Sequence, residues 1–253
     1  MTKFALLLLF STCLFFCGCR SVTVVQENKT ISQNLGGGVM LELMLIHPGK
    51  FLMGSEKENN AQPVHEVTIS QPFYLGKYEV TQAQWQEVMG VNPSYFKGAS
   101  LPVENVSWED CQRFIEKLNS KGIGTFRLPT EAEWEYACRA GSKDDDVENI
   151  DEMGWCDQNS GHSTQPVGTK QPNPWGLYDM YGNVWEWCQD WYAYYSAGKQ
   201  TDPKGPAAGT GRLCRGGGWS HPSKGNCSPA SRVARPPSFK RGNLGFRLVM
   251  LLP

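Results

Sequence analysis

The chain lacks an excess of charge of either sign. Its 253 residues include 24 lysines and arginines against 25 aspartates and glutamates, which gives a formal net charge of −1 at pH 7. Proteins that bind nucleic acid commonly carry a strongly basic face, because their partner is a dense array of phosphates. The balance therefore gives no reason to expect nucleic acid as a partner.

The most apolar run is too short for an ordinary membrane span. It covers residues 4–16 and leads into the small-residue segment Cys17-Gly18-Cys19, whereas a spanning helix needs about 20 apolar residues. This order resembles a bacterial lipoprotein signal peptide over residues 1–18, cut before Cys19. A lipid on the Cys19 sulfur would anchor an exported protein to a bacterial membrane, at the cell surface. Because Phe16 replaces the usual leucine of such signals, an ordinary secretory signal is the alternative.

The cysteines beyond that signal lack the C-x-x-C spacing of a structural zinc site. Export would place them in an oxidising compartment, in which disulfides form and persist. Their spacing does not choose among the possible connectivities. The cysteines concerned are Cys111, Cys138, Cys156, Cys188, Cys214 and Cys227.

Aromatic residues, glycine and proline are abundant. The chain has nine tryptophans, 27 glycines and 16 prolines. This mixture favours a compact, loop-rich domain over a disordered chain or a helical bundle. The length is enough to bury a substantial core, in one large domain or two small ones.

The segment after the signal has the composition of a linker. Residues 20–34 are polar and lack aromatics, and Gly36-Gly37-Gly38 follows. Such sequences behave as flexible chains. We therefore expect a flexible tether over residues 19–38, followed by one domain over residues 39–253.

Short apolar or alternating runs predict strands at the start of this domain. The runs cover residues 39–46, 51–54, 64–69 and 73–75. Because Pro48-Gly49 separates the first two runs, we expect those two strands to form a hairpin. His65 lies in the third run with no second histidine nearby, which favours a structural histidine over a metal ligand.

Helices follow, each with a start signal. They are expected over residues 82–89, 108–118 and 131–139, after Thr81, Ser107 and Thr130. In the first and third, a glutamine or glutamate three residues beyond the threonine completes a capping box. Gly141 is placed to end the third helix. No helical pattern is evident from Gly154 onward, so the layout is α+β.

The stretch from Arg212 to Arg247 has recognisable motifs at its two ends. The residues between these motifs show neither the helical nor the strand periodicity of apolar residues. Arg215-Gly216-Gly217 opens it and Gly245-Phe246-Arg247 closes it. We interpret the residues of these motifs as a framework that holds loops in place, and the residues between them as a surface that contacts a ligand. The alternative is that the whole stretch is a plain connecting loop. The residues expected on this surface are Ser220, His221, Pro222, Ser223, Gly225, Asn226, Ser228, Pro229, Ser231, Val233, Ser238 and Phe239.

Blocks of sequence in a fixed order carry a family resemblance. Residues 127–137 (RLPTEAEWEYA), residues 176–187 (GLYDMYGNVWEW), Arg215-Gly216-Gly217 and Gly245-Phe246-Arg247 resemble the formylglycine-generating-enzyme family. The match extends from about residue 40 to residue 250. The resemblance implies an α+β, C-type lectin-like fold with little regular secondary structure, and it determines the fold better than the function.

The enzymes of this family hold copper with a close pair of cysteines after the Arg-Gly-Gly element. Cys227 matches the second cysteine, but Ser220, His221 or Pro222 replaces the first. A lone thiolate does not form the paired soft-ligand site that copper(I) favours. We therefore expect no copper, no catalytic residue and no enzyme activity; a formylglycine-generating or related oxidase acting through Cys227 is the alternative. The histidines are too scattered for the iron site of the related sulfoxide synthases.

A third branch of the family resembles the chain more: the variable proteins of diversity-generating retroelements, in which adenines of the terminal coding segment are rewritten. The shared features are the lipoprotein-like signal, one domain, and a variable-looking segment near the C-terminus. All the expected surface residues belong to the set that such mutagenesis permits, provided that Lys224 and Lys240 are fixed positions. The resemblance implies a displayed ligand-binding protein, whose partner is an extracellular protein or another macromolecule. A structural lipoprotein with merely tolerated loops is a further alternative.

The resemblance also implies a calcium site. In the family, the segment matching residues 179–186 binds calcium through two side chains and two backbone carbonyls. Here the corresponding residues are Asp179, Gly182, Val184 and Glu186. Oxygen ligands of this kind suit calcium. The alternative is that the two carboxylates accept hydrogen bonds within the protein and bind no ion.

Overall fold

The computed structural model describes residues 29–145, 149–222 and 227–252. The signal peptide, Cys19 and three of the expected surface residues (Ser223, Gly225 and Asn226) lie outside these ranges. No helix among the described residues has the length and apolar character needed to cross a membrane.

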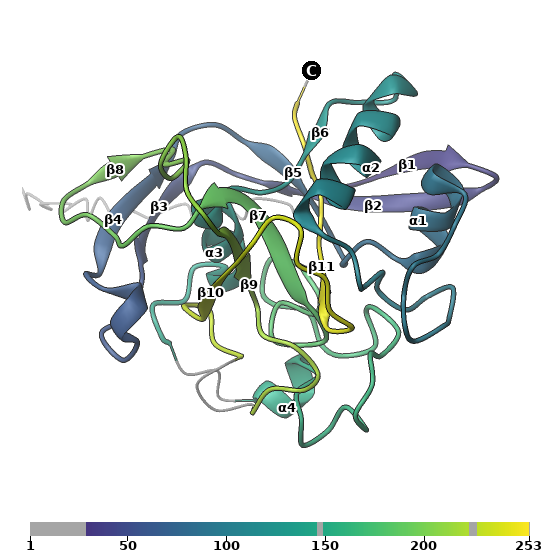
Figure 1. Cartoon of the computed structure of the whole chain (residues 1–253). Coiled ribbons are helices and arrows are strands. Elements are labelled where there is room, and N and C mark those ends of the chain that lie inside the picture. The colour runs from purple at the N-terminus through teal and green to yellow at the C-terminus, as the bar shows by residue number, and fades with distance from the viewer. Residues whose placement is uncertain (1–28, 146–148, 223–226, 253) are drawn as a thin grey trace, which may run out of the picture.

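The largest sheet has five strands and forms the centre of the domain (Figure 1). Its order is β1 (Thr30–Gly36), β2 (Val39–Ile46), β5 (Phe73–Gly76), β12 (Val249–Met250) and β6 (Phe126–Arg127). Each pair of neighbours is antiparallel. Strand β12 ends two residues before the last described residue and lies inside the sheet, between β5 and β6.

Two smaller sheets complete the strand structure. The four-stranded sheet has the order β10 (Arg232–Arg235), β9 (Arg212–Arg215), β7 (Trp185–Trp191) and β11 (Leu244–Gly245). The three-stranded sheet has the order β3 (Gly49–Met53), β4 (His65–Ile69) and β8 (Gln200–Thr201), with a 3-10 turn at Asn59–Ala61. In the four-stranded sheet, β9, β10 and β11 come from the terminal stretch, and β7 comes from the segment before it. Figure 1 shows β7, β9 and β10 close together, with β3, β4 and β8 to their left.

The capping signals locate the long helices correctly. The helices are α1 (Gln82–Met89), α2 (Trp108–Ser120), α3 (Glu131–Arg139) and the short α4 (Ile150–Met153). Thr81, Ser107 and Thr130 each accept a hydrogen bond from the third helical residue, whose side chain bonds back to the cap. Ala140 adopts the left-handed conformation that ends α3, and Gly141 follows it with a φ of +91°. As expected, no helix follows Gly154 in the described residues.

The expected tether is wrong over part of its length. Residues 30–36 form the edge strand β1, which pairs with β2 in register from Thr30 opposite Met44 to Gly36 opposite Val39. The glycines make the turn between them, because Gly37 and Gly38 have φ values of 55° and 80°. Successive left-handed residues are what a tight hairpin turn requires. A glycine run of this kind is thus a turn here and not a linker, and the domain begins near residue 30.

The expected hairpin of residues 39–46 with residues 51–54 is also wrong. Strand β2 pairs with β1 and β5, whereas β3 pairs with β4 in the other sheet. His65 lies on β4, is buried, and contacts the Pro63 carbonyl through Nδ1. The Pro48-Gly49 segment therefore carries the chain from one sheet to another.

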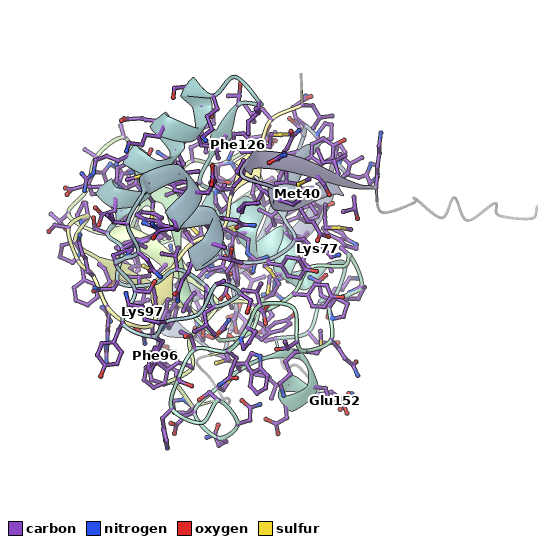
Figure 2. All side chains as sticks on the ribbon, turned by 90° about the vertical axis from the view of Figure 1, so that its right-hand side faces the viewer. Met40, Lys77, Phe96, Lys97, Phe126 and Glu152 are labelled. Carbon is purple, nitrogen blue, oxygen red and sulfur yellow. The ribbon has the colours of Figure 1, made fainter. Side chains whose placement is uncertain are left out.

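The five-stranded sheet is buried on both faces, which accounts for the nearly unbroken apolar sequence of β2. Leu41 and Leu43 join a core that includes the α1 and α2 side chains, while Met44 and Ile46 join a second core that includes α3. Strands covered on both sides read as continuous hydrophobic runs. Met40, at the hairpin end, is exposed, and Figure 2 shows it far from Glu152 on α4.

Candidate functional site

Arg215 fixes the start of the terminal stretch. Its side chain is fully buried, and its guanidinium contacts the Glu135 carboxylate of α3. It also donates to the carbonyl oxygens of Ala230 at 3.0 Å and Pro229 at 2.8 Å. A buried charge is tolerated only when it is paired and hydrogen-bonded in this way. Arg215 therefore holds β9, α3 and the chain before β10 together.

Arg232 and Arg247 act similarly further along. The Arg232 guanidinium makes two bonds to the Glu131 carboxylate, at 2.7 and 2.8 Å. The Arg247 guanidinium makes two bonds to the Glu186 carboxylate, at 2.6 and 2.7 Å. Paired bonds of this kind fix orientation as well as position. These contacts confirm that the arginines are framework residues.

A shallow hollow of about 20 Å³ lies at the four-stranded sheet, whose strands supply several of its lining residues. Its lining residues are Trp185, Cys214, His221, Val233, Arg235, Phe239, Arg241, Asn243 and Leu244. His221, Val233 and Phe239 are among the expected surface residues. The structure therefore brings three of them together, although His221 and Phe239 are 18 positions apart in the sequence. Half-buried rings beside a polar rim are a common form of binding surface.

His221 is oriented by its neighbours. Trp185 Nε1 donates to His221 Nδ1 at 3.3 Å, and the two rings meet edge to face. Burial lowers the pKa of His221, and the positive charges of Arg241 and Arg235 lower it further, against an opposing effect of Asp157. The imidazole is therefore neutral near pH 7, and because Nδ1 accepts, its proton lies on Nε2.

Two arginines give the hollow a positive rim, which the sequence reasoning missed. The Arg235 guanidinium lies 5.5 Å from the centre of the Phe239 ring, and Arg241 is exposed at the opposite end of the same segment. Ser220 Oγ accepts a bond of 2.9 Å from Asn243, which holds the adjacent loop. The signal that could have identified the arginines is their position on either side of Phe239 in the sequence.

Some expected surface residues are not on the surface. Pro229 and Ser231 are buried. The Pro229 carbonyl accepts a hydrogen bond from the buried Arg215 guanidinium, and the Ser231 amide donates to Ser228 Oγ. Ser228 is partly buried and donates to Glu58 at 2.6 Å. These assignments to the ligand surface are corrected: the chain there belongs to the framework. Pro222 and Ser238 are exposed, as expected.

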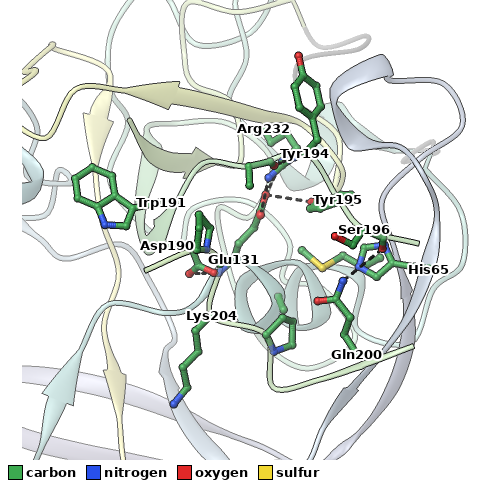
Figure 3. A pocket seen from close by; sticks show the side chains of 16 residues that line it. His65, Glu131, Asp190, Trp191, Tyr194, Tyr195, Ser196, Gln200, Lys204 and Arg232 are labelled. Atoms are coloured by element: carbon green, nitrogen blue, oxygen red, sulfur yellow. Dashed lines mark hydrogen bonds and ion pairs between the residues drawn. The ribbon is translucent and has the colours of Figure 1, made fainter. Parts of the chain in front are cut away.

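A larger cavity of about 370 Å³ lies on the other side of β10 (Figure 3). Arg232 lines it, whereas Val233 and Arg235 line the shallow hollow. Tyr195 donates to Glu131 at 3.1 Å, and Figure 3 shows Tyr195 and Arg232 meeting at this carboxylate. Strand β10 thus separates the two spaces, and the polar groups around Glu131 are bonded to one another.

Asp190, in the wall of that cavity, predicts a pH-dependent stability. Burial raises the pKa of Asp190 to about 7, and the neighbouring Glu131 charge raises it as well. A raised carboxyl pKa favours the folded state while the group is protonated, so stability is lost as pH rises from about 4 through 7. Asp190→Asn keeps an acceptor for the Glu131 amide, which Asp190 Oδ2 accepts at 2.9 Å. We expect the stability advantage of Asp190→Asn over the parent to be larger at pH 8 than at pH 5, by on the order of 1–3 kcal/mol.

Urea unfolding at these two pH values measures the difference. The matched control is Glu116→Gln, at an exposed carboxylate on α2, which should keep the fall in stability between pH 5 and pH 8. Parallel profiles for the parent and Asp190→Asn would show that the buried carboxyl titrates normally.

The expected calcium ligands occupy one region but have different contacts. The Glu186 carboxylate already accepts bonds from Arg247 and from Trp134 Nε1 at 2.7 Å. Asp179 Oδ2 accepts from the Gly168 amide at 2.7 Å, while Oδ1 is buried with no partner among the described residues. Within those residues no group of at least three His, Cys, Asp or Glu side chains is arranged to hold a metal. Asp179 thus has one carboxylate oxygen that could bind a cation, whereas the Glu186 carboxylate is already paired with Arg247. Calcium binding therefore stays a prediction.

The thiols are buried rather than displayed. All six described cysteines are free and buried. Burial raises the pKa of Cys214 well above its usual value, and reactive cysteines need an accessible thiolate. Ser220, His221 and Pro222, the positions at which the first copper ligand of the family would stand, lie at the hollow or beside it.

Comparison with known proteins adds to this geometry. The family model described as "Sulfatase-modifying factor enzyme 1-like domain" matches residues 34–252. The chaperone protein LppX of Paenibacillus barcinonensis is 34% identical over 233 residues, covering 70% of this chain and 78% of that protein. The formylglycine-generating enzyme of Streptomyces coelicolor is 32% identical over 239 residues, covering 86% and 69%. The solved structure of Treponema denticola variable protein 1 superposes with a TM-score of 0.81 at 32% identity, covering 88% and 99%.

Proposed function

Since the chain belongs to the family of sulfatase-modifying factor enzyme 1-like domains, with their α+β, C-type lectin-like fold, we propose that it uses this fold to bind a ligand at the hollow around His221 and Phe239. The observation that carries the proposal is that the residues holding the terminal loops in place differ from the residues that the loops expose to solvent. Arg215, Arg232 and Arg247 hold the loops by buried contacts. The residues of the hollow that belong to the terminal loops and to the outer face of β10, namely His221, Val233, Arg235 and Phe239, are partly exposed.

Because the framework contacts do not involve the exposed side chains of the hollow, those side chains can be substituted without loss of the fold. Substitutions at partly exposed positions away from caps and ion pairs usually cost little stability. Antibody loops on a rigid sandwich follow the same principle. The similarity over nearly the full length of Treponema denticola variable protein 1 supports a surface of this kind.

The proposed partner is an extracellular protein or another macromolecule, and the proposed location is the exterior of a bacterial cell. The lipoprotein-like signal and a lipid on Cys19 would anchor the domain there. The positive rim of Arg235 and Arg241 favours a ligand with acidic groups, because complementary charge speeds encounter and selects partners.

The DNA beside the gene tests whether the hollow is diversified. We expect a near-copy of the segment encoding residues 215–247, close to a reverse-transcriptase gene. The copy should differ from the gene only at positions where the copy has adenine. A coding segment without such a copy would make the terminal loops an ordinary loop set.

Tolerance of substitution tests the proposal in the protein itself. We expect His221→Ala and Phe239→Ala to lower the melting temperature by no more than about 3 °C, because each side chain is partly exposed and carries no ion pair. Phe246→Ala, at a fully buried ring, is the matched control and should cost about 3–5 kcal/mol. Calorimetry measures all three. A loss at His221 or Phe239 as large as that at Phe246 would place these residues in the framework.

The same positions can be randomised together. A library varied at Ser220, His221, Val233 and Phe239 should mostly survive a protease challenge, whereas a library varied at four buried framework positions should mostly be digested. If both libraries were digested to the same extent, the hollow would not be a display surface.

A second candidate is an oxidase of the formylglycine-generating type, which the 32% identity to the Streptomyces coelicolor enzyme supports. It predicts copper(I) binding and oxidation of a cysteine peptide, both lost in Cys227→Ser. Activity that survives in Cys227→Ser, or is absent from the parent, would count against this candidate.

A further inference from the structure

The cavity that Arg232 lines, on the other side of β10 from the hollow, has the size of a small-molecule site. Its volume is about 370 Å³, and ligand pockets in proteins occupy roughly 300–1,000 Å³. Among the described residues, none lines both this cavity and the hollow. The apolar part of its wall consists of Met53, Ala132, Ala193, Pro203 and Pro206. The cavity is therefore a separate space with room for a small ligand.

The Glu131 carboxylate in this cavity already has its partners. It accepts two bonds from the Arg232 guanidinium, at 2.7 and 2.8 Å, and one from the Tyr195 hydroxyl at 3.1 Å. The Arg215 guanidinium lies 3.5 Å away. Arg232 in turn donates to two backbone carbonyls, at 2.7 and 3.1 Å. Neither this carboxylate nor the Arg232 guanidinium therefore needs a ligand to satisfy it.

Asp190, in the same wall, lacks a cationic partner. Its side chain is buried, and Oδ2 accepts a bond of 2.9 Å from the Glu131 amide. Within the described parts of the chain, Oδ1 accepts no bond from another residue and Asp190 forms no ion pair. A buried carboxylate without a cation is costly. Burial and the negative charges of Glu131 and Glu133 accordingly raise the pKa of Asp190 to about 7.

The cationic side chains around Asp190 are engaged elsewhere or point away. The Arg212 guanidinium, which interacts with Asp190 electrostatically, lies between the rings of Trp108 and Trp191, 3.8 and 3.5 Å from their centres. It also donates to a backbone carbonyl at 2.6 Å. Lys204 is exposed, and Figure 3 shows its side chain pointing away from Asp190. The cavity thus has a carboxylate in its wall that no described cation pairs with.

We propose that this cavity binds a small organic cation, an amine with an apolar body, whose ammonium group pairs with the Asp190 carboxylate. The ammonium group donates to Oδ1, and the apolar wall covers the body of the ligand. An anion is disfavoured, because the donors of Arg232 are already used by Glu131 and by backbone carbonyls. The inference does not depend on the function proposed for the hollow.

Affinity for such a cation should rise with pH. Since the pKa of Asp190 is about 7, its carboxyl is protonated at pH 5 and mostly ionised at pH 8. A cation binds the ionised form, so its affinity should rise by about tenfold or more between these pH values. His65 also lines the cavity, and protonation of a histidine there would oppose cation binding in the same range. Asp190→Asn separates the two contributions.

NMR titration of the full chain with probes of one shape and different charge tests the proposal. The probes are benzylamine, which is a cation, benzyl alcohol, which is neutral, and benzoate, which is an anion. At pH 8 benzylamine should bind about tenfold or more tightly than benzyl alcohol, because a hydrogen bond to a charged partner is worth about that factor. Benzoate should bind more weakly than benzyl alcohol, since the same carboxylate repels it.

Variants locate the binding. Asp190→Asn keeps the size of the side chain and an acceptor for the Glu131 amide. It should bind benzyl alcohol as the parent does and lose the preference for benzylamine, with most of its pH dependence. Glu116→Gln removes an exposed carboxylate on α2 and should bind benzylamine as the parent does. The melting temperature of each variant confirms that it is folded.

Three results would overturn the proposal. The first is a parent protein that does not bind benzylamine at pH 8, or binds it no more tightly than benzyl alcohol. The second is tighter binding of benzoate than of benzylamine. The third is unchanged benzylamine affinity in Asp190→Asn, which would place the cation at another carboxylate.

Discussion

Arg215→Met is expected to lower the free energy of unfolding by about 3–5 kcal/mol, the cost of breaking a buried ion pair by removal of one partner. Methionine has a similar length but cannot bond to Glu135 or to the carbonyls of Pro229 and Ala230, all of which Arg215 contacts in the core. Those polar groups would remain buried without this donor. Chemical denaturation measures the change.

A surface ion pair supplies the control. Arg113 pairs with Asp110 three residues earlier on α2, and its side chain is more than half exposed. Arg113→Met should therefore cost less than about 1 kcal/mol. Hydrogen exchange should also accelerate at residues 228–231 in Arg215→Met and not in the control. Equal stability losses in the two variants would mean that the Arg215 contacts do not support the terminal stretch.

Gly182→Ala is expected to destabilise the protein by roughly 3 kcal/mol or more, from strain and overlap combined. Gly182 has a φ of +114°, and a Cβ there would lie 2.2 Å from the Trp155 carbonyl oxygen. Its amide also donates to the Gly216 carbonyl at 2.8 Å. A side chain would therefore force apart the segments that begin the terminal stretch and hold Cys156.

Gly141→Ala separates the two causes. Gly141 has a φ of +91°, but a Cβ there would have nothing within 4 Å. That variant should lose only the conformational cost of about 1 kcal/mol. Thermal unfolding of both proteins gives the comparison. If Gly182→Ala were no less stable than Gly141→Ala, the backbone near Trp155 would have moved to accept the side chain, and Gly182 would not be a close-packed position.

The sequence by itself located what depends on contacts within a few residues. Thr81, Ser107 and Thr130 marked the starts of α1, α2 and α3, because a capping box is closed between residues three positions apart. The blocks of family resemblance identified the fold, and Arg215 and Arg247 were recognised as framework. The sequence analysis assigned His221 and Phe239 to one candidate surface, and both line the same hollow, although their contacts with Trp185 and Arg235 were not foreseen.

Only the tertiary structure decided what depends on distant partners. The glycines at 36–38 form a turn and not a linker because β1 finds β2 beside it. Pro229 is buried beside Arg215, which pairs with Glu135 80 residues away in the sequence and also bonds to the Pro229 carbonyl. Hydrogen bonds between residues a few positions apart can be predicted from short sequence patterns. Burial and strand pairing depend on which distant segments pack against one another in the core.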